Sequence, residues 1–206
     1  MTVNNISIPY PNGDNYFGQA ILMYPNNYVP HGFGTKTFLD GGKYHGNFSY
    51  DHFNGWGHYS SFNGDYYKGD YTNDVPNGTG ESYQASSQRT YVGSFRMGVE
   101  DGFAVITKRD YAINGGTKRY EGEVRNGKRH GRGKLWVTQL DGQTAWFEGT
   151  WSYDLLNGYG KQISTNGRCF DGIFINGFLE GQGTCQAEDG KTYTVIFSKG
   201  VVIKWL

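Results

Sequence analysis

The feature that most constrains this chain is a glycine spacing that recurs along it. An aromatic residue and a glycine stand at alternate positions, and nine residues after that glycine comes a pair of glycines separated by one residue. The clearest copy runs from Tyr120 and Gly122 to Gly131 and Gly133. Because a fixed period of this length is typical of arrays of one supersecondary unit, we predict a single repeat array over residues 1–206.

The array has regular middle units and two irregular ends. The first unit carries an insert from Leu22 to Pro30, and the last has Val195 where the others have glycine. Irregular end units are typical of capped repeat arrays. The predicted repeats cover about 13–36, 41–60, 64–83, 88–107, 117–137, 142–163 and 167–186, followed by a degenerate cap at 189–206.

Strands, not helices, explain the spacing. Residues at alternate positions of a strand share one face, so Tyr120, Gly122 and Val124 lie on the same side. Glycine leaves a gap on that side, which we expect a ring of the next repeat to fill. Glycine every few residues would cost about 1 kcal/mol each inside a helix. We therefore predict an all-β chain of consecutive antiparallel hairpins.

Dipeptides that favour tight turns separate the expected strands. Asn-Gly and Asp-Gly tolerate positive φ at both central residues of a type I′ turn, so we predict this turn type at each of them. Those between repeats are Asn12-Gly13, Asp40-Gly41, Asn63-Gly64, Asp141-Gly142, Asn166-Gly167 and Asp189-Gly190, and those within repeats are Asn126-Gly127 and Asn176-Gly177.

Composition excludes several broad classes. Aromatic residues make up 17% of the chain, charged residues 18%, and the formal net charge is zero, which argues against disorder. A balanced charge also argues against a nucleic-acid partner, which needs a basic excess. No run of 18 apolar residues is present. Since Met1 to Ile8 do not resemble a secretory signal, we expect a cytoplasmic location.

The residue types needed for catalysis or metal binding are present without the spacing that such sites need. None of the five histidines forms a ligand-spaced pair with another histidine, and Cys169 and Cys185 stand sixteen residues apart. We expect these cysteines to be free thiols. The stretch from Gly127 to Gly131 lacks the ending of a phosphate-binding loop. We therefore expect no enzymatic activity, no metal site and no cofactor.

Two groups of residues are candidates for binding a partner. Residues 1–83 carry three lysines and seven acidic residues, whereas residues 118–134 carry seven basic and two acidic residues. This basic cluster is either a solvated surface or a site for an acidic protein or a lipid headgroup. Its members are Lys118, Arg119, Arg125, Lys128, Arg129, Arg132 and Lys134. Aromatic residues outside the packing positions are candidate protein-binding residues: Tyr24, Tyr28, Trp56, Trp136, Tyr159 and Trp205.

The unit from Tyr120-Glu121-Gly122-Glu123 to Gly131-Arg132-Gly133 resembles the MORN repeat (membrane occupation and recognition nexus). The resemblance implies one long, twisted and curved antiparallel sheet of β-hairpins. It also implies a non-enzymatic scaffold for other proteins, in a cilium, an axoneme or another cytoskeletal assembly, with self-association possible through the sheet ends. Two alternatives stay open: a peripheral membrane or phosphoinositide-binding module, and a targeting subunit for a separate enzyme.

Overall fold

The computed structural model describes residues 2–24, 26–110, 115–187 and 190–206, and in this part of the chain it contains 17 β-strands and no helix. Every strand pair is antiparallel, so the predicted all-β hairpin architecture is confirmed. The chain separates into two compact units, residues 1–100 and 101–206, which we describe separately as the first unit and the second unit.

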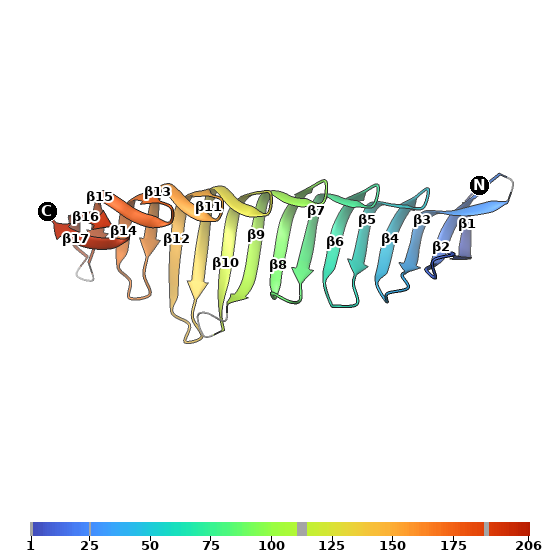
Figure 1. The fold of residues 1–206 in the computed structure, drawn as a ribbon, viewed down its shortest axis with the longest axis horizontal. Coiled ribbons are helices and arrows are strands. Elements are labelled where there is room, and N and C mark those ends of the chain that lie inside the picture. The colour runs from blue at the N-terminus through green and yellow to red at the C-terminus, as the bar shows by residue number, and fades with distance from the viewer. Residues whose placement is uncertain (1, 25, 111–114, 188–189) are drawn as a thin grey trace. The chain divides into compact units, whose positions relative to one another are not determined.

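In each unit the strands lie side by side in chain order (Figure 1). The first unit holds β1 (Thr2–Pro9), β2 (Asn15–Met23), β3 (Asn27–Thr37), β4 (Lys43–Ser49), β5 (His52–Ser60), β6 (Tyr66–Thr72), β7 (Val75–Gln84) and β8 (Arg89–Arg96). β9 (Val99–Asp110) begins at the last two residues of that unit, and the second unit continues with β10 (Gly116–Arg125), β11 (Lys128–Thr138), β12 (Thr144–Ser152), β13 (Leu155–Ile163), β14 (Cys169–Ile175), β15 (Phe178–Gln186), β16 (Thr192–Ser198) and β17 (Val201–Trp205).

The turns within repeats and those between repeats differ in conformation. Within repeats, both central residues have positive φ, as at Asn126 (50°) and Gly127 (73°) and at Asn176 (49°) and Gly177 (88°). These are the predicted type I′ turns.

Between repeats the type I′ prediction is wrong. Only the glycine has positive φ at Gly13, Gly41, Gly64, Gly142 and Gly167, while the preceding Asn or Asp does not. The N–H of Gly41 donates to the Phe38 carbonyl at 3.0 Å, which is the pattern of a type I turn followed by one left-handed residue. This loop is one residue longer than the two-residue loop of a type I′ hairpin. Asp189 lies outside the described residues.

A β-bulge follows the core glycine of most repeats. The register shifts between Gly69 and Tyr71 and between Gly122 and Val124, so one residue of the first strand has no direct partner. In several repeats that residue is polar and its side chain accepts a backbone hydrogen bond from the opposite strand. The pairs are Gln19 Oε1 with the Phe33 N–H (2.7 Å), Asp70 Oδ2 with the Thr79 N–H (2.9 Å) and Glu123 Oε1 with the Arg132 N–H (2.9 Å).

The core lies on one face of the strands, which we call the ring face. In the repeats headed by tyrosine, that ring is buried and its hydroxyl donates to a backbone carbonyl three residues later, as from Tyr44 to Asn47 (2.9 Å). Edge-to-face ring contacts of 4.8–5.3 Å join successive hairpins of the first unit. The buried rings of that unit are Tyr16, Tyr44, Phe48, Tyr67, Tyr71, Tyr91 and Phe95.

The prediction that a ring of the next repeat fills the gap over the glycines holds only in part. A Cβ placed on Gly80 would lie 2.6 Å from the ring of Tyr67, which belongs to the same repeat. In the last repeats the ring does come from the next hairpin: a Cβ on Gly160 would lie 3.1 Å from Phe174. The sequence pattern alone did not separate these two arrangements.

Candidate open-face groove

The face opposite the ring face, which we call the open face, carries the residue that stands between each pair of closing glycines. Because side chains alternate along a strand, a residue between two glycines of the ring face points the other way. Trp56 in the first unit and Phe103 and Tyr159 in the second are exposed, Phe103 by 60% and Tyr159 by 64%. The repeat therefore places large exposed side chains at one position of the open face.

A groove of about 780 Å³ crosses the open face of the second unit. It spans strands β9 to β13, and its floor is backbone at glycines that pair across strands: Gly122 with Gly133, and Gly133 with Gly149. Aromatic side chains on β9, β11 and β13 line it, together with charged ones on β10, β11 and β12. The lining residues are Phe103, Glu121, Arg132, Lys134, Trp136, Glu148, Thr150 and Tyr159.

Lysine and glutamate on neighbouring strands organise one end of the groove. Lys134 lies opposite Glu148 in the register, and their side chains form an ion pair at 3.1 Å. The Lys134 ammonium also lies 3.9 Å from the ring centre of Trp146 and 5.4 Å from that of Trp136. Each such cation–π contact stabilises the arrangement by about 0.5–1 kcal/mol at an exposed site.

Arg132 differs from these residues. It stands between the closing glycines Gly131 and Gly133, and Glu123 fixes its backbone. Among the described residues its guanidinium takes part in no ion pair, although it lines the groove. The groove therefore combines aromatic walls with one cationic side chain that has no acidic partner in the described parts of the chain.

Hydrogen bonding also fixes the far wall of the groove. The Tyr159 hydroxyl donates to Asp171 Oδ1 at 3.1 Å, and this bond raises the pKa of Tyr159 above its ordinary value. On the ring face beneath, burial raises the pKa of Tyr120, while the nearby Arg129 opposes that shift. Both phenols are therefore neutral at physiological pH.

The predicted basic cluster does not form one free patch. Four of its seven members are held in ion pairs: Lys118 with Asp110, Arg119 with Glu121, Arg129 with Asp154, and Lys134 with Glu148. Arg132 lines the groove, whereas Arg125 and Lys128 flank the type I′ turn of their hairpin.

The predicted aromatic candidates lie in several places. Trp136 and Tyr159 share the groove, whereas Trp56 lies on the open face of the first unit. Tyr24 and Tyr28 belong to the β2–β3 hairpin, and Trp205 belongs to β17; all three are exposed. Whether these residues bind a partner stays a prediction.

One aromatic residue of the groove, Phe103, and one aromatic residue beside the groove, Trp146, were absent from the predicted set. Phe103 occupies the same position as Trp56 and Tyr159, between the closing residues of its repeat, but the loss of one glycine there hid the equivalence. Trp146 lies directly opposite Trp136 in the register. The place of Trp146 beside the groove depends on the residue-by-residue pairing of β11 with β12, which the sequence pattern did not predict.

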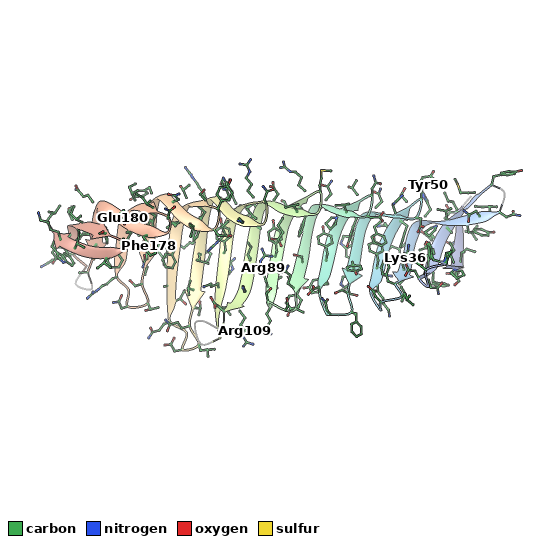
Figure 2. All side chains as sticks on the ribbon, viewed as in Figure 1. Lys36, Tyr50, Arg89, Arg109, Phe178 and Glu180 are labelled. Carbon is green, nitrogen blue, oxygen red and sulfur yellow. The ribbon has the colours of Figure 1, made fainter. Side chains whose placement is uncertain are left out.

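The histidines and cysteines of the described residues do not belong to a metal site. No group of three or more His, Cys, Asp or Glu side chains there has the geometry to hold a metal ion. Cys169 and Cys185 are buried free thiols, and burial raises the pKa of Cys185, which disfavours the reactive thiolate. His31 packs edge-on against Tyr50, which Figure 2 labels, at 5.1 Å. The described residues form strands and no helix, so no helix among them is long and apolar enough to span a bilayer.

A protein-family model matches the chain along much of its length. The model described as "MORN repeat" matches residues 22–43, 67–88, 91–112, 120–139, 147–167 and 170–192, more than half of the chain. Residues 44–66 lie between two matched segments, yet Gly46 pairs with Gly57 there as the glycines pair in the matched segments.

Proposed function

The chain belongs to the MORN-repeat family, and from this premise we propose that it is a non-enzymatic scaffold that binds other proteins through the open-face groove. Repeats of this family are generally interaction modules for proteins or membranes and are typically non-catalytic. The observation that carries the proposal is the groove of the second unit, lined by Phe103, Trp136 and Tyr159.

The groove has the properties of a protein-binding site. Exposed aromatic side chains dominate binding energy at protein interfaces because they bury a large area at low entropic cost. Here they stand on paired strands, and ion pairs and a hydrogen bond hold their surroundings. A partner therefore binds a surface that is already ordered, which lowers the entropic cost of association.

We place this scaffold in the cytoplasm, as a structural subunit of a cilium, an axoneme or another cytoskeletal assembly. The resemblance to scaffold members of the family supports this setting, and the groove does not bear on it. The partners are other proteins of that assembly. Self-association through strand edges belongs to the same proposal, because Val201, Ile203 and Trp205 of β17 are exposed.

Binding to an anionic membrane is the second candidate. Arg125 and Lys128 lie beside a turn, and the Lys128 ammonium lies 5.8 Å from the ring centre of the exposed Tyr153, so cations and an aromatic side chain meet there. Ion pairs engage four of the seven basic residues, however, and leave little excess charge for lipid headgroups. The groove therefore favours a protein partner.

Affinity capture with the full chain at low and moderate salt, followed by mass spectrometry, tests the scaffold. We expect near-stoichiometric retention of one or a few cytoskeletal proteins at moderate salt. Retention of a single enzyme instead would favour the targeting-subunit alternative.

Sedimentation with vesicles that contain phosphatidylserine and phosphatidylinositol phosphates tests the lipid alternative. We expect the chain to stay in the supernatant at physiological salt. Vesicle binding that falls with salt and disappears in the Arg125→Glu/Lys128→Glu variant, without any retained protein, would overturn the scaffold.

A further inference from the structure

We propose that the open-face groove recognises an acidic segment of a partner protein, in which a carboxylate pairs with Arg132 and flanking apolar side chains pack on Phe103 and Tyr159. This inference rests on the proposed function and names the chemistry of the partner.

Arg132 supplies the polar anchor. Its backbone N–H donates to Glu123 and its strand position lies opposite Thr150, so the side chain starts from a fixed point on the groove floor. A guanidinium offers a planar fork of donors that matches a carboxylate with two parallel hydrogen bonds. Among the described residues, no carboxylate forms an ion pair with this fork.

The other charges of the groove decide the sign of the partner. Glu148 is engaged by Lys134, and Glu121 is engaged by Arg119 at 2.8 Å. Arg132 is the groove charge that remains unmatched in the described residues. A basic segment would meet the Arg132 guanidinium there, unpaired among the described residues, whereas both carboxylates that line the groove, Glu121 and Glu148, are already engaged in ion pairs.

The walls of the groove set the length and character of the segment. Phe103 on β9 and Tyr159 on β13 lie four strand spacings apart, which corresponds to about 19 Å at about 4.8 Å per spacing. An extended chain of about six residues covers that distance at about 3.3 Å per residue. The segment therefore has room for a carboxylate at its centre and an apolar side chain toward each end.

The first unit supplies an internal contrast. Its corresponding groove, of about 530 Å³, is lined by Phe17, Phe33 and His45 over Gly18 and Gly34, and none of its lining residues is lysine or arginine. It repeats the aromatic walls without the cationic anchor. Acid recognition is thus a property of the second unit and not of the repeat itself.

Fluorescence anisotropy with a labelled octapeptide tests the proposal directly. The probe alternates glutamate with phenylalanine, and a control peptide replaces each glutamate with lysine. With the full chain at physiological salt, we expect the glutamate peptide to bind at least about tenfold more tightly than the lysine peptide, as expected for unlike charges at a matched site. Equal binding of both peptides, or no binding of the glutamate peptide, would overturn the proposal.

Matched variants locate the binding. Arg132→Ala should weaken the glutamate peptide about tenfold, while Lys128→Ala, which removes the same charge outside the groove, should change it less than about twofold. Phe103→Ser should weaken it similarly, and Phe178→Ser, at a residue equally exposed (56%) and labelled in Figure 2, should not. Equal losses in a pair would refute the assignment. Circular dichroism confirms that each variant is folded.

The two proposals fail separately. If Phe103→Ser releases the captured protein and Arg132→Ala does not, the scaffold stands and acid recognition is refuted. If the peptide binds with the expected charge preference but no protein is captured, the groove chemistry stands and the scaffold is refuted.

Discussion

The repeats headed by tyrosine in the first unit and those headed by phenylalanine in the second unit build the same hairpin with different packing. In the first unit, Tyr44 covers the pair Gly46 and Gly57 with its own ring. In the second unit, Phe147 and Phe170 are only partly buried. Leu156 and Leu179, on the following strand, are buried instead and lie close to the glycines.

The difference shows that the glycines, and not the identity of the ring, define the repeat. A tyrosine reaches across both glycines and bonds the backbone, which demands a very close fit. A leucine reaches the same space from the opposite strand. In the repeat headed by Phe147 the backbones still approach closely, since a Cβ on Gly149 would lie 2.7 Å from the Gly160 backbone. Only the repeat headed by Phe170 leaves more room. A Cβ on Gly46 would lie 2.5 Å from the Gly57 backbone, whereas one on Gly172 would lie 3.1 Å from the flexible end of Leu179.

Alanine at the core glycine should give the largest difference between the repeat headed by Tyr44 and the repeat headed by Phe170. Gly46→Ala forces backbone apart and should destabilise the protein by about 3 kcal/mol or more, while Gly172→Ala displaces only a side chain and should cost about 1 kcal/mol or less. Urea denaturation followed by tryptophan fluorescence measures both. Equal costs would mean that the two packings are equally tight.

High pH should weaken the tyrosine-headed repeats. Burial raises the pKa of Tyr16 and of Tyr67 from 10.0 to about 12. The folded protein thus keeps protons that the unfolded chain loses, so the stabilisation is complete below pH 10 and is lost as the pH rises toward 12. Each group accounts for at most about 2.7 kcal/mol.

Urea midpoints between pH 8 and pH 12 measure this dependence, and Tyr67→Phe should flatten it. An unchanged slope in that variant would show that Tyr67 does not titrate with unfolding.

Loss of a single tyrosine hydroxyl should have a smaller effect. Tyr44→Phe removes the 2.9 Å bond to the Asn47 carbonyl and should cost about 1–1.5 kcal/mol. Phe170→Tyr adds a hydroxyl to a partly buried ring and should change stability by less than about 0.5 kcal/mol. Thermal unfolding compares the two variants with the wild type. A cost at Phe170 as large as that at Tyr44 would contradict the distinction.

The bulge residue should give the smallest difference. Asp70 accepts bonds from the Thr79 N–H and hydroxyl, so Asp70→Ala should cost about 1 kcal/mol. Ile173 occupies the equivalent sequence position in the last phenylalanine-headed repeat, but it is exposed and pairs directly with Glu180, so Ile173→Thr should change stability by less than about 0.5 kcal/mol. Differential scanning calorimetry resolves both. A cost at Ile173 as large as that at Asp70 would contradict the role of the Asp70 side-chain bonds.

The sequence predicted the hairpins because glycine spacing has few other physical solutions. The alternation of Tyr120, Gly122 and Val124 specified one buried face, and the structure buries all three. The turns between repeats were mistaken because Asn-Gly and Asp-Gly also suit a longer loop in which only glycine has positive φ. Dipeptide identity does not fix loop length.

The groove was only partly predictable. Trp136 and Tyr159 were identified as aromatic residues outside the packing positions, but their shared site depends on the pairing of five strands. The prediction of a basic cluster counted the charges correctly, but it did not show which of these side chains are held in ion pairs. Partners such as Asp154 lie some 25 residues away in sequence, so the ion pairs depend on which hairpins are neighbours.

The most direct test of the central claim compares two exposed phenylalanines in the same capture experiment. Full chains carrying Phe103→Ser or Phe178→Ser are matched to the wild type for folding, and the captured proteins are quantified by mass spectrometry. If the open-face groove binds the partner, Phe103→Ser should reduce its recovery about tenfold while Phe178→Ser leaves it unchanged. Undiminished recovery with Phe103→Ser, or equal loss with both variants, would show that the partner binds elsewhere.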